Sequence, residues 1–373
     1  MVDLKVQYEK IQDEVDHAIR EVLDNTAFIN GPAVKSFEED LENYLDAKHV
    51  IPCANGTDAL QVAMMALGLK PGDEVIAPTF TFIATAEVIA LLGLTPVLVD
   101  VDPETFNIDP AAVEKAITPK TKAIVPVHLF GQCADMNSLL EIAQKHQLYI
   151  IEDNAQAIGA DYILRNGKTV KAGTMGQIGC TSFFPSKNLG CYGDGGAIFT
   201  NDDQLADKIT SIVNHGMRIR YYHDEIGVNS RLDSIQAAIL KVKLKYLDQY
   251  AEARQKAAKA YDEAFSGVHG IKTPKRNPDS THVFHQYTLV LEGIDREGLR
   301  DYLAQNEIPA MIYYPVPLHK QKAYLDPRYN EGDFPVSEKL AGTVISLPMH
   351  TELDSEQINH ITSHILKYIN QHG

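Results

Sequence analysis

Lys187 lies in a polar, glycine-bounded turn that directly follows the apolar run 179–184. Upstream, a second apolar run over 148–151 ends in a pair of carboxylates whose second member is Asp153. Both runs are typical of strands, so the sequence places an amine nucleophile and a carboxylate at two strand ends. Pyridoxal phosphate chemistry requires this pair. The lysine holds the cofactor as a Schiff base, and the aspartate keeps the pyridine nitrogen protonated so that the ring accepts electrons.

Each of these residues also has a simpler interpretation. Lys187 could be one of the chain's many solvated lysines, and Asp153 could cap a helix that follows the strand. Because ligands gather at the carboxyl ends of strands in α/β sheets, both interpretations place Asp153 at the same edge. Gln156 would face the same site and reach the hydroxyl of the cofactor ring, or it could lie on a helix surface. We predict that Lys187 is the Schiff-base residue and proton shuttle and that Asp153 is the partner of the pyridine nitrogen.

A cofactor phosphate needs backbone N–H donors and a favourable helix dipole. Asn55 is the predicted cap of a helix whose first turn contains Gly56 and Thr57, and this turn supplies both features. Ser182 could add a hydroxyl. The segment 78–82 follows a further strand and offers an aromatic face for stacking on the cofactor ring, although core packing would also explain its phenylalanines.

Two later segments carry groups that suit a larger polar substrate. The segment 215–231 combines imidazole, guanidinium, phenol and amide groups, which fit phosphate and sugar hydroxyls, and it ends in Asn229 and Arg231. The segment 313–319 begins with Tyr313 and Tyr314 and ends in His319, with stiff prolines between them. An exposed polar loop and a packed turn are the respective alternatives.

The pattern of elements predicts an α/β protein with a mainly parallel sheet. Helical and strand patterns alternate over the first two-thirds of the chain, and several strands are apolar on both faces. A helix is expected over 6–23, and a long helix that begins at 233–234 is expected to run past Tyr261 and join two domains. We predict a large domain over 1–248, including the N-terminal helix, and a small domain over 249–373.

Composition restricts the partners and the compartment. The net charge of −16 disfavours nucleic acid and anionic membrane surfaces. No apolar run approaches the length of about 18 residues that a membrane helix needs, and the charged start of the chain does not resemble an export signal. The four cysteines form no CxxC pair and have no histidines at metal-ligand spacing. We therefore expect a cytoplasmic protein with buried thiols and no metal.

The motifs together resemble the DegT/DnrJ/EryC1/StrS family of sugar aminotransferases, and the resemblance runs over nearly the whole chain. The segments that carry it are 54–60, 72–76, 79–82, 131–132, 152–156, 182–187, 193–197 and 227–233. This resemblance implies fold type I of the pyridoxal phosphate-dependent transferases, with a mostly parallel seven-stranded sheet and a smaller C-terminal α+β domain. It also implies a homodimer whose active sites lie at the subunit interface.

The resemblance implies a role for each motif residue. Lys187 and Asp153 are the catalytic pair, and Gln156 approaches the ring hydroxyl. Phe82 stacks on the ring. The residues implied to hold the phosphate are Gly56, Thr57, Ser182 and, from the neighbouring subunit, Asn229.

Within the family, segments 53–57, 131–135 and 182–203 are similar to aminotransferases that act on a UDP-2-acetamido-3-keto-glucuronic acid. Those enzymes take the amino group from L-glutamate, leaving 2-oxoglutarate, and make a 3-amino sugar for bacterial O-antigen in lipopolysaccharide. In that subgroup Arg231 and Tyr314 would contact the nucleotide sugar. Tyr313 stands where the subgroup carries histidine, beside the expected substrate.

Other activities share this fold. Related dehydratases carry histidine in place of the lysine, and Lys187 argues against that chemistry. A dTDP-linked sugar, amination at C-4, a non-catalytic regulator and an enzyme acting on a plain amino acid remain alternatives. The cluster that contains Asn229, Arg231 and Tyr314 fits a large phosphorylated substrate better than a plain amino acid.

Overall fold

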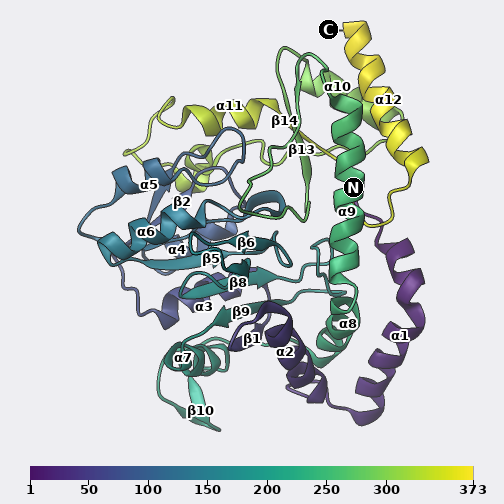
Figure 1. Cartoon of the computed structure of the whole chain (residues 1–373). Helices are drawn as coiled ribbons and strands as arrows, with labels where there is room; N and C mark the ends of the chain where they lie inside the picture. Colours follow the sequence, from purple (N-terminus) through teal and green to yellow (C-terminus); the bar gives the residue numbers. More distant parts are fainter. Residues whose placement is uncertain (373) are drawn as a thin grey trace.

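The central sheet of the computed structural model, which describes residues 1–372, has seven strands in the order β1-β9-β8-β5-β4-β2-β3 (Figure 1). Four neighbouring pairs, from β8 across to β3, are parallel, whereas β9 runs antiparallel to both β8 and β1. The mostly parallel sheet expected from the sequence is confirmed. The strands are β1 His49–Cys53, β2 Glu74–Pro78, β3 Thr95–Val99, β4 Thr121–Ile124, β5 Tyr149–Asp153, β8 Ile178–Ser182 and β9 Gly196–Thr200.

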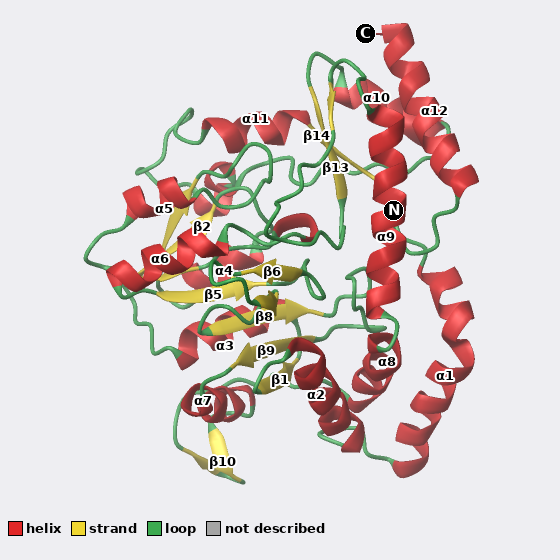
Figure 2. Cartoon of the chain, viewed as in Figure 1, coloured by secondary structure: helices red, strands yellow, loops and turns green. Residues whose placement is uncertain are grey.

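Helices bury the central sheet (Figure 2). Because both faces of the central strands are buried, these strands carry apolar residues at adjacent positions as well as at alternate ones. One apolar cluster joins the sheet to α3 Gly56–Ala66, α4 Ala84–Leu91 and α7 Asp203–Val213. A second joins it to α5 Pro110–Ala116 and α6 Met136–His146. A third packs α2 Pro32–Leu45 and α8 Ser234–Leu244 against β1 and β9.

The long helix expected from the sequence is instead two helices, so that prediction was wrong. Helix α8 ends at Leu244, and α9 Leu247–Phe265 begins after a break at Lys245 and Tyr246. Val242 of α8 packs in a cluster with α1, whereas Tyr261 of α9 packs in the core of the C-terminal unit. The chain changes direction at this break because the apolar side chains of α8 pack on α1, whereas those of α9 pack in the core of the C-terminal unit. The side chains of Lys245 and Tyr246 both bond Glu14 of α1 and fix the break.

The C-terminal unit is built on a three-stranded antiparallel sheet of β12 Ile271–Lys272, β13 Tyr287–Leu291 and β14 Val344–Leu347. Helices α9, α10 Arg296–Gln305 and α12 Ser355–His372 enclose its core. The domain boundary at 248/249 stays a prediction, and it lies two residues into the described range of α9.

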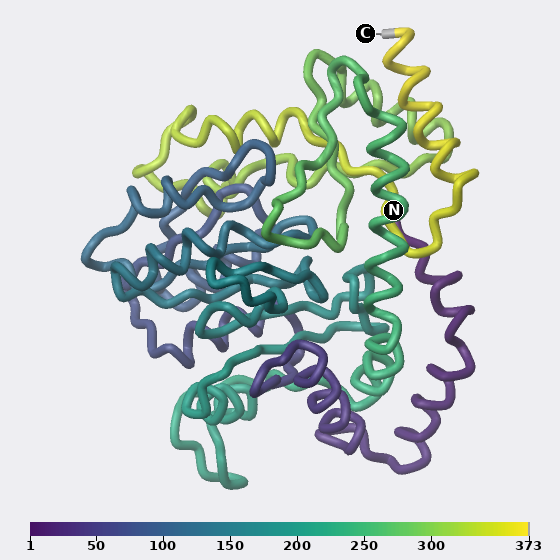
Figure 3. The backbone as a smooth tube through the Cα atoms, in the orientation of Figure 1, coloured from purple at the N-terminus to yellow at the C-terminus, as the bar shows by residue number. Residues whose placement is uncertain are grey.

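Helix α1 Leu4–Asn25 runs along the outside of the molecule between the two units (Figures 1 and 3). Near its start, the N–H of Met349 donates to the carbonyl of Met1 at 3.1 Å, and Gln7 bonds Thr351. Further along, Ile11 and Val15 pack on Ile239 of α8.

Short elements complete the described chain. The hairpin β10 Met217–Ile219 and β11 Tyr222–His223 projects beyond α7 at the lower edge of Figure 1. A second hairpin pairs β6 Asp161–Ile163 with β7 Thr169–Lys171. The remaining elements are α11 Pro335–Thr343 and the 3₁₀ turns Leu129–Gly131, Leu318–Lys320 and Lys322–Tyr324.

Asp100, at the end of β3, caps α11 from outside the helix. Its carboxylate accepts hydrogen bonds from the N–H groups of Val336 and Ser337, each at 2.9 Å, and from the Ser337 hydroxyl. We predict that Asp100→Ala lowers the free energy of unfolding by about 1–2 kcal/mol, the usual cost of losing a helix N-cap. Urea unfolding followed by circular dichroism measures this.

Asp13→Ala is the matched control, because Asp13 is exposed on α1. We expect the control to stay within about 0.5 kcal/mol of the wild type. An unchanged unfolding midpoint for Asp100→Ala would show that α11 docks without this cap.

Candidate active site

A cavity of about 660 Å³ lies at the carboxyl edge of the central sheet, and Lys187 and Asp153 both line it. The start of α3, the loop after β2 and the segment around Tyr314 form its other walls. The predicted site residues that line it are Gly56, Thr57, Phe82, Asp153, Gln156, Ser182, Lys187, Tyr313 and Tyr314. Residues from five separate segments of the chain therefore meet where the sequence placed a single site.

The loop that follows β8 holds Lys187 in place. The Lys187 N–H donates to the Phe184 carbonyl at 2.8 Å, and the Asn188 side chain donates to the Val283 carbonyl at 2.9 Å. Burial lowers the pKa of the Lys187 amine to about 8, an effect that the nearby Asp153 carboxylate partly opposes. An amine with this pKa is neutral in an appreciable fraction of molecules near neutral pH, as a nucleophile must be.

Asp153 is the last residue of β5 and is held from two sides. One carboxylate oxygen accepts from the Thr85 hydroxyl at 2.8 Å, and the other accepts from the Ala155 N–H at 3.2 Å. No α-helix follows β5 directly, so Asp153 is not a helix N-cap, which was the alternative interpretation. The carboxylate stays directed at the cavity, opposite the Lys187 amine.

Glu152 is a buried residue of this edge that the sequence analysis did not identify. Its carboxylate pairs with the His128 ring at 2.8 Å and accepts from the N–H groups of Gly173, Met175 and Gly176. His128 Nδ1 accepts from the Ala134 N–H, so Nε2 is the nitrogen that donates to Glu152. Adjacent residues of a strand point to opposite faces, so Glu152 and Asp153 serve different sides of the sheet. The sequence signal that could have identified Glu152 is the pair of successive carboxylates at the end of this strand.

Gln156 connects the cavity to the C-terminal unit. Its carbonyl oxygen accepts from the Phe130 N–H at 2.7 Å, and its amide donates to the Tyr314 hydroxyl at 3.1 Å. Burial raises the pKa of Tyr314, so its hydroxyl stays protonated. Phe82 presents a ring that is 55% exposed, 6.4 Å from the Tyr314 ring centre, and an open aromatic face is what ring stacking needs.

The first turn of α3 forms an anion cradle. Asn55 caps the helix by accepting from the Asp58 N–H at 2.8 Å, and no residue among 1–372 accepts from the N–H groups of Gly56 and Thr57. A Cβ at Gly56 would lie 2.7 Å from the Ser182 Cβ, so only glycine allows the two segments to approach. Two free N–H groups and a hydroxyl at a helix N-terminus suit a phosphate.

The residues present fit pyridoxal phosphate. An amine with a lowered pKa, a fixed carboxylate, an open aromatic ring and a phosphate cradle line one cavity. The Thr81 hydroxyl is buried in the wall without a partner among the described residues, as a polar atom awaiting a ligand would be. Within residues 1–372, no group of three or more His, Cys, Asp or Glu side chains is arranged to hold a metal.

Three of the predicted residues lie outside this cavity. Arg231 lines a separate cavity of about 540 Å³ beside the β10–β11 hairpin, and Asn229 is bridged to Asn214 next to it. His319 is buried, with its ring nitrogens next to the Thr79 hydroxyl at 2.9 Å and Glu338 at 3.2 Å. The geometry therefore gives His319 a position behind the cavity wall rather than in it.

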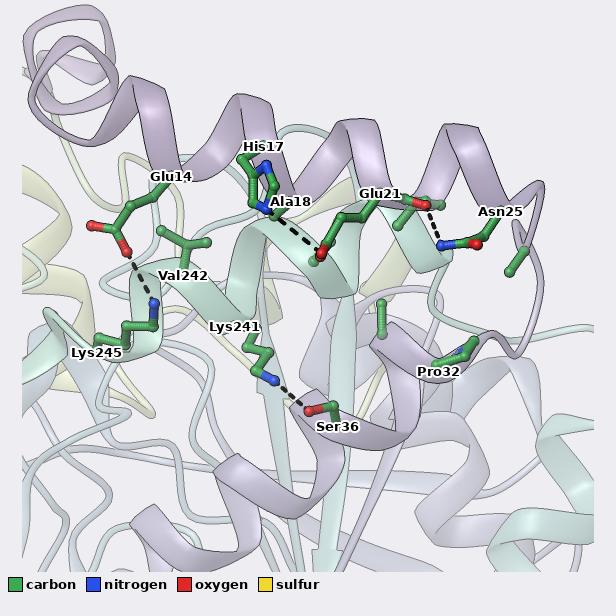
Figure 4. Close-up of a pocket in the computed structure, with 14 residues that line it drawn as sticks. Glu14, His17, Ala18, Glu21, Asn25, Pro32, Ser36, Lys241, Val242 and Lys245 are labelled. Carbon is green, nitrogen blue, oxygen red and sulfur yellow. Dashed lines mark hydrogen bonds and ion pairs between the residues drawn. The ribbon is translucent and has the colours of Figure 1, made fainter.

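A further cavity of about 510 Å³ between α1, α2 and α8 has a different character (Figure 4). Its charged groups are paired within the protein: Lys245 with Glu14 at 2.9 Å, His17 with Glu21 at 3.6 Å, and Lys241 with the Ser36 hydroxyl. The side chains that could take part in catalysis line the cavity at the carboxyl edge of the central sheet instead.

A family model that describes the DegT/DnrJ/EryC1/StrS aminotransferases matches residues 9–366. The chain belongs to this family. It is 49% identical to a UDP-2-acetamido-2-deoxy-3-oxo-D-glucuronate aminotransferase of Pseudomonas aeruginosa, over 96% of each chain. It is also 49% identical to a pleiotropic regulatory protein of Geobacillus stearothermophilus, over 99% of this chain and 98% of that protein.

Solved structures agree. The fold is similar to that of Streptomyces venezuelae DesV in complex with a ketimine intermediate, with a TM-score of 0.93 and 40% identity over 98% of this chain and 97% of that one. Bacillus subtilis NtdA with bound cofactor PMP is similar at a TM-score of 0.88, with 33% identity over 97% of this chain and 82% of that one. This family member is a sugar aminotransferase that depends on pyridoxal phosphate.

The four cysteines are buried and free, as predicted. None of the helices within residues 1–372 combines the length and apolar character of a membrane span.

The pKa of Lys187 leads to a pH prediction. When pyridoxal phosphate is added to the apo-aminotransferase, we expect the capture rate to rise roughly tenfold per pH unit below about 8 and to level off above it. The reason is that only the neutral amine attacks. Stopped-flow absorbance measures the rate.

Lys187→Ala should give no capture signal. Lys243→Met is the matched control: burial also lowers the pKa of Lys243 to about 8, but its amine donates to the Gly190 carbonyl behind the loop. A capture rate that kept rising up to pH 10 would contradict the assignment.

Proposed function

We propose that this aminotransferase transfers the amino group of L-glutamate to the C-3 keto group of a UDP-linked 2-acetamido-3-keto-glucuronic acid. The proposal rests on the relative from Pseudomonas aeruginosa, whose name states that substrate and whose sequence aligns over almost the whole of both chains. Tyr313 and Tyr314, which line the cavity, are the proposed contacts to the sugar. His319 is proposed to support that segment through its bonds to Thr79 and Glu338.

The single observation that carries a catalytic role is the Lys187 amine facing Asp153 inside one cavity, with its pKa lowered by burial. Burial also lowers the pKa of Lys243, but that amine donates to the Gly190 carbonyl, whereas the Lys187 amine lines an open cavity as a catalytic lysine would. Because the Geobacillus relative is named a pleiotropic regulatory protein, a regulatory role is the second candidate function.

Pyridoxal phosphate, when bound, withdraws electrons from the substrate carbon that carries the amino group. Lys187 would hold the cofactor through its amine, and its Nζ would carry the proton that leaves the substrate carbon to the cofactor carbon that receives it, in the opposite direction for the second substrate. Thr85 and Ala155 fix the two oxygens of the Asp153 carboxylate, which would face the ring nitrogen of the bound cofactor. Gln156 would orient the ring hydroxyl, and the turn that contains Gly56 and Thr57 would anchor the phosphate.

The aminotransferase is proposed to work as a homodimer with shared active sites. Asn229 and Arg231 lie beside a projecting hairpin, outside the cavity of their own chain. The hairpin region exposes large apolar side chains, with Ile219 68%, Tyr221 75% and Ile226 87% exposed. A surface of this kind is typical of a subunit interface. We propose that Asn229 and Arg231 complete the cavity of a second copy.

A cytoplasmic location and a role in bacterial polysaccharide biosynthesis, such as O-antigen or lipopolysaccharide, follow from the proposed substrate. UDP-sugars and L-glutamate are cytoplasmic metabolites, and the protein's net charge of −16 fits a soluble substrate rather than nucleic acid.

Absorbance of the purified holoenzyme tests the proposal. L-glutamate should convert the yellow form to the amine form, and the UDP-3-keto sugar should restore the yellow form. Restoration only by a dTDP-linked or 4-keto sugar would replace the substrate while keeping the activity. A protein that captures no cofactor would favour the regulatory role.

Asp153→Asn should lower the rate of each half-reaction by about 10²- to 10³-fold, because the ring nitrogen position loses its charge partner. Single-turnover absorbance measures both rates, and circular dichroism checks the fold. Asp194→Asn is the matched control, because Asp194 also lines the cavity but is exposed. Equal rates for the two variants would remove Asp153 from the mechanism.

Mixing inactive Lys187→Ala and Asn229→Ala proteins should restore about a quarter of the wild-type activity, since half of the dimers formed at random are mixed and each has one intact site. Activity after subunit exchange is the measurement. No recovery in a mixture shown to contain mixed dimers would mean that each site is built within one chain.

A further inference from the structure

One wall of the cavity belongs to a buried loop, residues 128–134, that follows β4. Phe130 of this loop lines the cavity. Its φ of 58° lies in the left-handed region, and Gly131 follows with a φ of 112°. A bulky residue keeps such a conformation only where the surrounding contacts hold it. The shape of the loop therefore depends on its buried partners.

A histidine and a glutamate anchor the two ends of the loop. His128 and Glu152 are both fully buried, and the His128 ring donates from Nε2 to the Glu152 carboxylate at 2.8 Å. His128 Nδ1 accepts from the Ala134 N–H at 3.2 Å, so one imidazole ring ties the last residue of the loop to the first. The Glu152 carboxylate is fixed in turn by three N–H groups of residues 173–176. Both ends of the loop are thus attached to the face of β5 that points away from the cavity.

Asn107 holds the middle of the same loop. Its side chain is buried, and Oδ1 accepts from the Leu129 N–H at 2.9 Å. Its Nδ2 donates to the carbonyls of Gln132 and Cys133 at 3.3 and 3.2 Å. The asparagine, the histidine and the glutamate are all enclosed within one chain, so their bonds to the loop do not depend on a ligand or on a second copy.

The loop in turn fixes the orientation of Gln156. The Phe130 N–H donates to Gln156 Oε1 at 2.7 Å. Because a main-chain N–H can only donate, the amide oxygen has to face Phe130 and the NH₂ group has to face the other way. One N–H of that group donates to the Tyr314 hydroxyl at 3.1 Å, which leaves the second N–H for a ligand in the cavity. The loop also bonds the neighbouring catalytic residue, because the His128 N–H donates to the Asp153 carbonyl at 3.0 Å.

We propose that His128, Glu152 and Asn107 are positioning residues of this aminotransferase, which act through Gln156 on the ring hydroxyl of pyridoxal phosphate, an inference that rests on the proposed role of Gln156. None of the three lines the cavity. An N–H donor beside the ring oxygen stabilises its negative charge most when the nitrogen that joins the cofactor to Lys187 has lost its proton. A correctly placed loop therefore lowers the pH at which that proton leaves.

The visible absorbance of the holoenzyme without substrate reports this pH, because the bound cofactor changes colour when that nitrogen loses its proton. Gln156→Leu should raise the pH midpoint by about half a unit to one unit, the effect of one lost hydrogen bond. His128→Phe and Asn107→Ala should move the midpoint in the same direction. The double variant of His128→Phe and Gln156→Leu should shift no further than Gln156→Leu alone, because both changes act on one group. The two loop variants remove different contacts, so either one tests the proposal if the other does not fold.

His350→Phe is the matched control. His350 is also buried and also accepts a main-chain N–H through Nδ1, from Glu352 at 3.3 Å, but it does not line the cavity or contact the loop. This variant should lower the temperature of thermal unfolding and leave the absorbance midpoint at the wild-type pH. A loss of stability alone is thereby separated from a loss of positioning.

A wild-type midpoint in both His128→Phe and Asn107→Ala would overturn the positioning role. Shifts that add in the double variant would also overturn it, because His128 would then act independently of Gln156. A wild-type midpoint in Gln156→Leu would remove the group through which the loop is proposed to act. The measurement uses neither L-glutamate nor a nucleotide sugar, so a failure of either proposed substrate would leave its result unchanged.

Discussion

The register of two parallel strands is the constraint on which the rest of the site depends. Strand β5 pairs with β8 so that Asp153 lies opposite Cys180, and the loop after β8 then returns Lys187 to the same edge. A shift of one residue would turn Asp153 away and bring Glu152 to the cavity face, because side chains alternate along a strand. Glu152 resists that shift from the opposite face, where a histidine and three backbone N–H groups hold its carboxylate. The geometry of this edge of the cavity is therefore secured by a residue that does not line the cavity.

The site is also a compromise between two substrates. Desolvation makes the lysine amine reactive, and the same low polarity penalises every further charge in the cavity. In the wall of the cavity, the Gln156 side chain bonds both the Tyr314 hydroxyl and the Phe130 N–H.

Much of this could be predicted from local sequence. Lys187, Asp153 and the Asn55 cap lie where a strand meets a turn, and such junctions are set by nearby residues. The mostly parallel sheet could be predicted from the apolar runs in the sequence, which correspond to its strands. The break between α8 and α9 could not be predicted, because it depends on Glu14, which lies more than two hundred residues away in the chain. The two successive carboxylates mark Glu152 in the sequence, but its partners could not be predicted, because they are His128 and the backbone of residues 173–176. His319 was expected in the substrate pocket from its proximity to Tyr314, but the 3₁₀ turn at Leu318–Lys320 directs it to Thr79.

Helix α1 has a consequence for the order in which this protein matures. It is synthesised early, yet its partners are α8 and the segment 349–352, which leave the ribosome much later. Until then its apolar stripe, which includes Ile11, Val15 and Val22, has nothing to cover it. The helix can therefore bury its apolar stripe only after α8 has left the ribosome, and it can bond the segment 349–352 only later still, so its two ends acquire their partners at different stages of synthesis.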